Sequence, residues 1–379
     1  MNYRLKGGEV FDPDFVFRKH DVFIRDEKIS LSPCGEFENI DITGMKLIPG
    51  LTDIHFHGCM GHDFCDGDPA VIKIMAEYEA SKGITQICPA TMTYTEEKLS
   101  SVMKAAAHYI SDTGAHLVGI NLEGPFISHE KKGAQNPEYI HAPDIEMFRR
   151  LNILSGNMIK LVALAPEVKG AEQFTDALKD ETVISFAHSA SDYDTAVKAF
   201  ERGVHHMTHI YNAMEGINHR HPGPISAAAD MGTVEAEIIC DGVHIHPAVV
   251  RNTIKLFTDE RIIFISDSME AAGMPDGEYE LGGQKVYKTG NKAVLKDGTI
   301  AGSASDLMDC LRQAVLKMNI PLETAVKCAA VNPARSIGIY DKYGSIEEGK
   351  TANLLVTDDS LNVRMVFING KIQKIPEKP

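Results

Sequence analysis

The chain has 379 residues, of which 44% are hydrophobic, so it can bury a large core; this is long for one domain, although barrels reach this size. It carries 53 acidic and 38 basic residues, a net charge of −15, which argues against nucleic acid or an anionic membrane as a partner. No apolar run reaches the roughly 18 residues that a membrane-spanning helix needs, and the many charges in residues 1–26 do not fit a secretory signal.

The first 48 residues contain β-like segments at 9–13, 21–25 and 46–48, separated by turns rich in glycine and aspartate. After Pro49-Gly50 the pattern changes, because apolar strands now alternate with amphipathic helices. That alternation is typical of βα units around a parallel sheet.

Eight strands and seven intervening helices are expected in this region. The strands are expected at 51–56, 84–91, 116–122, 158–165, 183–187, 205–210, 235–240 and 261–266. The helices are expected at 69–82, 96–111, 143–154, 171–178, 193–202, 224–231 and 247–257, and several begin with a capping residue or a proline. The count and length predict an α/β fold with a (β/α)8 TIM barrel. An open doubly wound sheet is the alternative, although no Gly-x-Gly-x-x-Gly follows the first strand.

The segment after the eighth strand has a different residue pattern. Residues 277–302 are rich in glycine and alternate in polarity, so we expect β-hairpins inserted there. Helices are expected at 306–318 and 322–337, and β-segments at 353–358 and 363–372. Short β-segments bury little alone, so we expect both chain ends to form one small β-sandwich domain (1–49 and 345–379) beside a barrel of 50–344.

Residues able to bind a metal follow several of the expected strands. The active site of a barrel lies at the C-terminal ends of its strands. The residues expected at those ends are His55, His57, Glu123, His188, His209 and Asp267. Side chains two apart in an extended chain point the same way, so His55 and His57 would aim both imidazoles at one point. Four histidines and two carboxylates at the same end of the barrel predict a metal site.

The ligand types indicate the chemistry of that site. Imidazole and carboxylate ligands with open coordination positions suit Zn²⁺ or Fe²⁺. Such a metal lowers the pKa of bound water to about 7 and so provides a nucleophile at neutral pH. Asp267 is the best candidate to take the proton of that water and pass it to a leaving group. The alternative role for Asp267 is to cap the loop that follows.

Longer motifs surround these residues. They are PGLTDIHFHG (49–58), NLEGPF (121–126), KKGAQNP (131–137), LAPE (164–167), THIYNAM (208–214), CDGVH (240–244), NPAR (332–335) and EGKTAN (348–353). Together they resemble the amidohydrolase superfamily of metal-dependent hydrolases, and within it the N-acetylglucosamine-6-phosphate deacetylase family. The resemblance extends over nearly the whole chain.

The resemblance implies a role for each matching residue. Glu123, His188 and His209 match the ligands of the principal metal, and Asp267 matches the general base and acid. Some members have two non-histidine residues at the strand-one positions and hold one metal. Because this chain has His55 and His57 there, we expect two divalent metals per chain, Zn²⁺ or Fe²⁺, with Glu123 as a bridge between them.

Substrate contacts also follow from the resemblance. Arg220 matches a contact to the substrate phosphate and His244 a contact to the sugar or phosphate, while Asn212 and Ala213 would offer amide or backbone groups. Gln135 stands where some relatives have a histidine that holds the substrate carbonyl; its amide can donate a hydrogen bond but cannot be cationic. Arg220 and His244 have alternative roles, as a solvated loop residue and a loop-packing residue.

The implied reaction is hydrolysis of N-acetyl-D-glucosamine 6-phosphate to D-glucosamine 6-phosphate and acetate, in amino-sugar catabolism or recycling of cell-wall sugars. Relatives form dimers in which a partner loop can complete the phosphate site, so we expect a homodimer. The seven cysteines are odd in number and lack a Cys-x-x-Cys spacing, which predicts reduced thiols and a cytoplasmic location.

Three alternatives stay open. The substrate can be the galactosamine epimer, or the chain can be another amidohydrolase such as a cyclic amidase or a deaminase. A carbamylated lysine at the end of strand four, which a cyclic amidase would need, is missing, because Lys160 lies near the start of that strand. A non-catalytic sugar-phosphate binding protein is disfavoured by Asp267 beside a full set of ligands.

Overall fold

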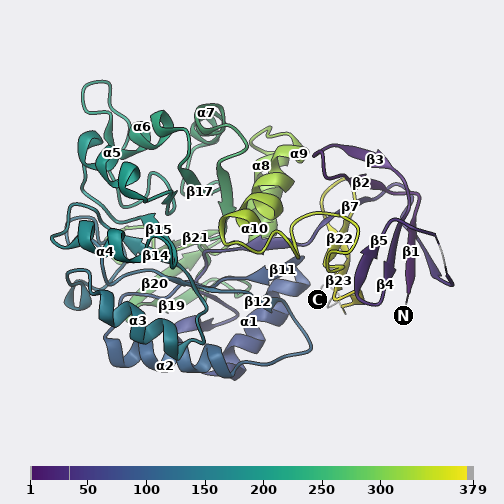
Figure 1. The fold of residues 1–379 in the computed structure, drawn as a ribbon, viewed down its shortest axis with the longest axis horizontal. Coiled ribbons are helices and arrows are strands. Elements are labelled where there is room, and N and C mark those ends of the chain that lie inside the picture. Colours follow the sequence, from purple (N-terminus) through teal and green to yellow (C-terminus); the bar gives the residue numbers. More distant parts are fainter. Residues whose placement is uncertain (1, 34, 374–379) are drawn as a thin grey trace.

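The computed structural model describes residues 2–33 and 35–373, which form two parts (Figure 1). A larger part alternates parallel strands with helices. A smaller part contains mostly antiparallel strands and both ends of the described chain, and it lies at one side of the molecule. Cys34 and the last six residues of the expected sandwich domain, 374–379, lie outside the described residues.

All eight expected strands of the larger part are present, although each is shorter than expected and 116–122 forms two strands. They are β8 (Leu51–Asp53), β11 (Ile84–Ile87), β12 (His116–Leu117), β13 (Ile120–Leu122), β14 (Ile159–Leu164), β15 (Val183–Phe186), β16 (His206–Met207), β17 (Glu235–Ile239) and β18 (Ile262–Ile265). The strands end early because the chain turns at their C-terminal ends, where the predicted site residues lie.

These strands pair in parallel and mostly in chain order. One sheet has the order β12-β11-β8 and the other the order β13-β14-β15-β16-β17-β18. The Asn121 backbone N–H donates to the Pro89 carbonyl at 2.9 Å, which joins the two sheets. The Asp267 backbone N–H donates to the His55 carbonyl at 2.9 Å, which links the end of the last strand to the end of the first. The result is a curled parallel sheet with its first and last strands side by side.

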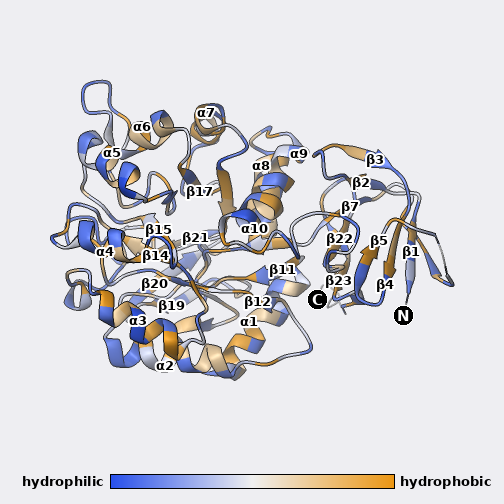
Figure 2. Ribbon diagram, viewed as in Figure 1, coloured by the Kyte–Doolittle hydropathy of each residue, from blue (hydrophilic) through white to orange (hydrophobic). Residues whose placement is uncertain are grey.

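Helices follow the strands as expected. They are α1 (Pro69–Ser81), α2 (Glu96–His108), α3 (Ile145–Leu154), α4 (Ala171–Leu178), α5 (Tyr193–Arg202), α6 (Gly223–Met231), α7 (Pro247–Phe257) and α8 (Leu307–Leu316). Aspartate side chains cap α1, α3, α5 and α8, and each such cap contributes about 1 kcal/mol. The helices carry both hydrophilic and hydrophobic residues along their length (Figure 2), as expected of helices with one face on a sheet.

The helix expected at 322–337 differs from expectation. It consists of α9 (Leu322–Val326), a π-helical turn (Lys327–Val331) and α10 (Asn332–Ser336). Pro333 has no N–H to donate to the carbonyl one turn back, and the wider π turn accommodates that gap.

The smaller part contains two sheets. Their strands are β1 (Tyr3–Lys6), β4 (Val22–Arg25), β5 (Lys28–Ser30) and β6 (Glu38–Asp41) in the order β5-β4-β1-β6, and β2 (Glu9–Phe11), β3 (Phe17–Lys19), β7 (Lys46–Pro49), β22 (Leu354–Thr357), β23 (Val363–Ile368) and β24 (Lys371–Ile372) in the order β24-β23-β22-β7-β2-β3. The pairing of β7 with β22 places segments from both chain ends in one sheet. Buried residues of both sheets, such as Leu5, Ile24, Leu47 and Phe367, form a common cluster.

The segment 277–302 forms an antiparallel sheet of β19 (Gly277–Leu281), β20 (Gln284–Thr289) and β21 (Lys292–Val294), as the hairpin prediction requires. The Gln284 side-chain amide donates to the Ala134 carbonyl, which attaches this sheet to the loop that contains Gln135. Short elements complete the chain near the mouth of the curled sheet: β9 (Gly58–Cys59), β10 (His62–Asp63) and two 3-10 turns (Phe64–Asp66 and Pro137–Tyr139).

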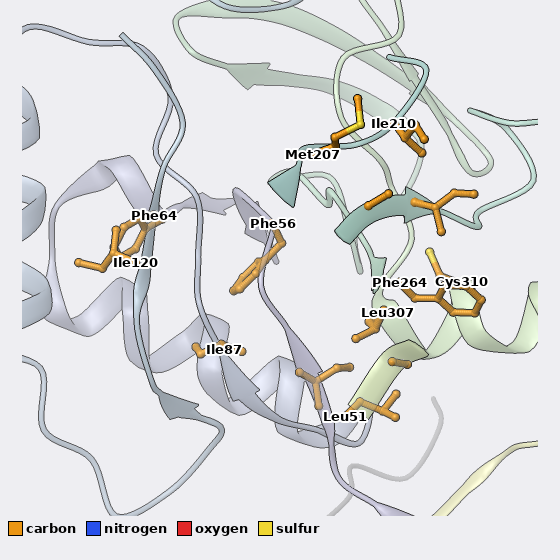
Figure 3. Packing of buried hydrophobic residues seen from close by; sticks show 14 of the residues in the cluster. Leu51, Phe56, Phe64, Ile87, Ile120, Met207, Ile210, Phe264, Leu307 and Cys310 are labelled. Atoms are coloured by element: carbon orange, nitrogen blue, oxygen red, sulfur yellow. The ribbon is translucent and has the colours of Figure 1, made fainter. Parts of the chain in front are cut away.

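A hydrophobic core supports the parallel strands (Figure 3). Leu51 of β8, Ile87 of β11, Ile120 of β13 and Phe264 of β18 are all fully buried, and Leu307 of α8 belongs to the same cluster. In the part of the chain that the structure describes, no helix has the length and apolar character needed to cross a membrane.

Candidate functional site

The six predicted ligand residues lie at the C-terminal ends of five strands. His55 and His57 follow β8, Glu123 follows β13, His188 follows β15, His209 follows β16 and Asp267 follows β18. These residues are 0% to 8% exposed, so contact with water does little to stabilise the charge of the carboxylates. Residues more than 200 positions apart in the sequence therefore meet in one buried cluster.

The carboxylate of Glu123 lies at the centre of this cluster. Its Oε1 atom is 3.0 Å from Nε2 of both His188 and His209, and 3.5 Å from Nε2 of His55. Its Oε2 atom is 3.3 Å from Nε2 of His57. Oε1 thus faces three of the imidazoles and Oε2 faces the fourth, so both carboxylate oxygens lie beside nitrogens that could bind a metal.

Asp267 completes the cluster on the side of the strand-one histidines. Its Oδ1 atom is 3.3 Å from Nε2 of His57 and 3.7 Å from Nε2 of His55. The ligand atoms of His55, His57 and Asp267 all lie within 4.8 Å of one another, and so do those of His55, Glu123 and His209. The cluster thus contains two overlapping sets of donors, each able to surround a cation.

The donors fit a divalent transition metal. Nε2 of His55 is buried and has no hydrogen-bond partner within residues 2–33 and 35–373. A buried nitrogen without a partner is costly, and a ligated cation removes that cost. Imidazole nitrogen with carboxylate oxygen suits Zn²⁺ or Fe²⁺, whereas Mg²⁺ and Ca²⁺ prefer oxygen ligands alone.

Neighbouring groups hold the ligands in place. The Lys131 carbonyl lies 2.9 Å from Nδ1 of His188, so this histidine can donate from Nδ1 and keep Nε2 free for a metal. The Gln135 amide donates to Oε2 of Glu123 at 2.7 Å, and its own oxygen accepts from the Thr93 backbone N–H at 2.7 Å. Gln135 therefore contacts a ligand directly, a contact that the sequence did not predict.

Three of the six predicted ligand residues have an uncommon backbone conformation. The φ angles are 46° at His188, 28° at His209 and 49° at Asp267. L-residues rarely adopt positive φ, and each instance costs on the order of 1–3 kcal/mol. These residues lie where three strands end and the chain turns, so the rest of the fold offsets that cost while it directs the three side chains into the cluster.

Both carboxylates of the cluster are ionised at neutral pH. Burial by itself raises the pKa of Glu123, but the charge of His55 and the bonds to His188 and His209 outweigh it and hold that pKa well below its usual range. Burial likewise raises the pKa of Asp267, but the hydrogen bond to His57 and the nearby histidines lower it below the ordinary value. Ionised carboxylates are what metal ligation and proton acceptance require.

A cavity of about 240 Å³ opens onto the cluster. Its lining includes the ligand residues His57, Glu123, His188, His209 and Asp267, the predicted substrate residues Gln135, Asn212, Ala213 and His244, and Leu281, Thr299 and Ile300 from the inserted hairpins. The hairpins therefore form one wall of the space in which a substrate would meet the ligands.

The predicted substrate residues differ in how they are held. Nδ1 of His244 lies 2.7 Å from Asp241 Oδ2, so this histidine is fixed with Nε2 left over for another partner. The Asn212 amide donates to the carbonyls of His209 and Ile210 at 3.2 and 3.3 Å. Arg220 is exposed and is not among the described residues that line the cavity. Within a single chain, the structure does not bring Arg220 to the other candidate residues.

Comparison with known proteins identifies the family. The family model described as "Amidohydrolase family" matches residues 47–373. The chain belongs to the amidohydrolase family. It is therefore a hydrolase, and the resemblance found in the sequence motifs is confirmed.

Relatives of this chain within the family are named as deacetylases of N-acetyl-hexosamine 6-phosphates. The chain is 36% identical to an N-acetylglucosamine-6-phosphate deacetylase of Bacillus subtilis (strain 168), over 88% of this chain and 85% of that one. It is 33% identical to an N-acetylgalactosamine-6-phosphate deacetylase of Escherichia coli O157:H7, over 86% of this chain and 87% of that one. A relative named for the glucosamine substrate and one named for the galactosamine substrate are thus about equally similar to this chain in sequence.

Solved structures show the same amidohydrolase fold. The crystal structure of N-acetylglucosamine-6-phosphate deacetylase from Pasteurella multocida has a TM-score of 0.92 and 28% identity, and the match covers 98% of this chain and 100% of that one. A mutant of the Mycobacterium smegmatis enzyme in complex with N-acetyl-D-glucosamine-6-phosphate has a TM-score of 0.91 and 28% identity, covering 98% and 99%. The likeness extends over the curled sheet and the terminal sheets together.

The sequence analysis missed a buried carboxylate that contacts two of the predicted ligand residues. Glu237, in β17, is fully buried and its carboxylate contacts His55 and the backbone of His209. The available signal was a glutamate inside an apolar strand, between Ala236 and Ile238, because a charge in such a place needs a partner. Finding that partner requires knowing which strands are neighbours.

Proposed function

We propose that this chain hydrolyses the acetamide bond of N-acetyl-D-glucosamine 6-phosphate and releases D-glucosamine 6-phosphate and acetate. The observation that supports this most is the buried cluster of Glu123, four histidines and Asp267 at the floor of a 240 Å³ cavity. Relatives with the same named activity match the chain over most of its length.

We assign the roles of the cluster as follows. His55, His57, Glu123, His188, His209 and Asp267 hold two divalent cations, Zn²⁺ or Fe²⁺, with Glu123 between them. Such cations, when bound, acidify water and polarise a carbonyl oxygen.

Asp267 moves the proton of the reaction. It accepts a proton from the attacking water as the new carbon–oxygen bond forms, and it delivers that proton to the amine nitrogen as the carbon–nitrogen bond breaks. Its ionised state and its place on the cavity wall suit the first step. Gln135, which lines the cavity and donates to Glu123, orients that carboxylate.

The phosphate group of the substrate would be bound at a distance from the acetamide bond that is cleaved. We assign His244 to the sugar or phosphate, because Asp241 holds its Nδ1 and the residue lines the cavity. Asn212 and Ala213 offer groups on the same wall. Arg220 is exposed within one chain, so we assign it to a phosphate site that is completed in a homodimer. Contacts to a remote phosphate supply binding energy for positioning the acetamide.

The larger part of the chain is best understood as a closed (β/α)8 barrel, 50–344, with its inserted hairpins. The backbone bond between Asp267 and His55 supports closure. The two terminal sheets and their shared cluster support a small β-sandwich domain of 1–49 and 345–379. The six cysteines within the described residues are unpaired and buried, which fits a reducing cytoplasm.

Acetate release tests the proposed reaction. Purified protein loaded with Zn²⁺ or Fe²⁺ is given N-acetylglucosamine 6-phosphate, and acetate is measured in a coupled assay. We expect multiple turnovers, and at least a tenfold lower kcat/KM with N-acetylglucosamine that lacks the phosphate, because the phosphate contacts are lost.

The galactosamine 6-phosphate epimer is the second candidate substrate, since a relative at 33% identity is named for it. It is assayed in parallel under the same conditions. A clear preference for this epimer would change the substrate assignment, and absence of acetate from every N-acetyl-hexosamine 6-phosphate would refute the deacetylase proposal.

A further inference from the structure

Glu237 is a fully buried carboxylate behind the metal cluster. It is the third residue of β17 and has an exposed fraction of 0%. Among the described residues, it is not one of those that line the cavity. It therefore does not face the space where a substrate binds. A buried carboxylate is stable only where several donors surround it.

Three donors from two other strands surround this carboxylate. Oε2 lies 2.8 Å from Nδ1 of His55 and accepts the backbone N–H of His209 at 3.1 Å. Oε1 lies 3.0 Å from Nε2 of His206. Two of the three donors belong to residues that we assign as ligands, one through its imidazole and the other through its backbone.

The bond to His55 decides which nitrogen of that ring is free. A neutral imidazole has a donor on one nitrogen and a lone pair on the other. Metal binding requires a neutral His55, and an ionised Glu237 can only accept, so the one proton that His55 then keeps lies on Nδ1 and Nε2 is the nitrogen left for a cation. Nε2 is the atom that faces Glu123 Oε1 at 3.5 Å and Asp267 Oδ1 at 3.7 Å and that has no other partner in the described chain.

His206 keeps Glu237 ionised and in place. This histidine is fully buried, and its Nδ1 atom lies 3.2 Å from Ser336 Oγ and 3.6 Å from Glu235 Oε2. Burial lowers the pKa of His206, but Glu235 and Glu237 outweigh it and raise that pKa to about 9. A cationic His206 therefore offsets the negative charge of Glu237 at neutral pH.

We propose that Glu237 is a positioning residue for the cation held by His55, His57 and Asp267. It fixes the tautomer and ring orientation of His55 and anchors the backbone of His209, so the two strands present their ligands at matched depth. This inference rests on the proposed metal-dependent function, because it assigns a carboxylate that acts through two of the proposed ligands.

Zinc affinity tests this assignment without relying on activity. Metal-free wild type, Glu237→Gln and Glu235→Gln are titrated with Zn²⁺ in competition with a chromophoric chelator. Glutamine keeps the size of Glu237 but turns the N–H groups of its amide toward at least one of the three donors, and loss of such a contact typically costs 10–100-fold in metal affinity.

The expected result is two zinc equivalents in wild type and a loss of about 10–100-fold in affinity for one of them in Glu237→Gln. The control Glu235→Gln removes a charge from the same strand and beside the same His206, but contacts neither His55 nor His209. In this variant a neutral His206 can still donate from Nε2 to Glu237, so we expect it to bind both equivalents as wild type does. Unchanged affinities in Glu237→Gln, or a single zinc equivalent in wild type, would overturn the assignment.

A measurement on wild type covers the case in which Glu237→Gln does not fold. Nitrogen-15 NMR of the zinc-loaded protein should place the proton of His55 on Nδ1 and the zinc on Nε2. The reverse tautomer would overturn the proposal. These readouts are separate from acetate release: two zinc equivalents without acetate would contradict the proposed function and leave the role of Glu237 standing.

Discussion

At the scale of single residues, the site is a set of short contacts around two carboxylates. Glu123 lies within 3.0–3.5 Å of all four histidines, and Asp267 within 3.3–3.7 Å of the two that follow β8. Both carboxylates line the cavity, but Glu123 is surrounded by four histidines and is 1% exposed, whereas Asp267 contacts two of them and is 8% exposed. This difference in position is the basis for the proposal that Glu123 is shared between the cations and that Asp267 exchanges protons with a substrate.

The substitution Asp267→Asn tests that separation. Asparagine keeps the shape of the side chain but cannot accept the proton of the attacking water, and general acid–base catalysis typically contributes about 10²–10⁴-fold. We expect kcat to fall by that factor, while metal analysis still finds cation bound to Glu123, His188 and His209. A turnover near that of wild type would exclude Asp267 as the proton-transfer group.

Sequence patterns predicted which residues would lie together at the site, for a physical reason. The spacing of His55 and His57 follows from the two-residue repeat of an extended strand, and strand ends meet at one mouth of a parallel barrel. The contact of Gln135 with Glu123 and the three bonds of Glu237 depend on the register between distant segments. That register is set by the folded sheet, so no local pattern could reveal these contacts.

At the scale of elements, the boundaries of strands and helices depend on where polar groups are satisfied. The strands stop short of their apolar runs, and positive φ angles at His188, His209 and Asp267 turn the chain toward the site. The sequence does not mark these turns clearly, because positive φ is uncommon in any residue except glycine, even though aspartate and histidine adopt it more often than most. The break of 322–337 into α9, a π turn and α10 was visible in principle from Pro333.

Helix α1 contains a buried carboxyl group that makes stability depend on pH. Glu79 has an exposed fraction of 0%, and neither carboxylate oxygen has a hydrogen-bond partner in the described chain. Burial, with smaller contributions from Asp53 and Asp306, raises its pKa well above the ordinary 4.5. The folded protein thus keeps a proton that the unfolded chain releases above about pH 4.5, so this group lowers the stability as pH rises from there through the folded pKa.

The variant Glu79→Gln removes this titration. We expect its free energy of unfolding, relative to wild type, to increase between pH 5 and pH 8 by up to about 1.4 kcal/mol for each pH unit. Urea unfolding of metal-free protein at several pH values measures the difference. Glu77→Gln, on the exposed face of the same helix, serves as the control and should follow wild type. Parallel curves for Glu79→Gln and wild type would refute a neutral Glu79.

At the scale of the whole molecule, strands from both ends of the chain pair in one sheet beside the curled parallel sheet. β7 leads directly into β8, and β7 pairs with β22, so the terminal sheets are tied to the strand that ends in His55 and His57. The sequence predicted β2, β4, β7, β22 and a β-segment at 363–372, but not β1, β3, β5 or β6. These eight strands are similar in length, but the four that were missed (YRLK, FRK, KIS and ENID) contain more charged and polar residues than the four that were predicted, so they lack a clear apolar signal.

The central claim is that six residues from five strands hold metal beside a substrate cavity. Anomalous diffraction at the zinc edge, from crystals of the zinc-loaded protein, tests it most directly. We predict one peak in contact with Glu123, His188 and His209 and a second in contact with His55 and His57, at the usual ligand distances of about 2.0–2.2 Å. A map with no peak in contact with Glu123, or with zinc bound only elsewhere on the protein, would contradict the claim.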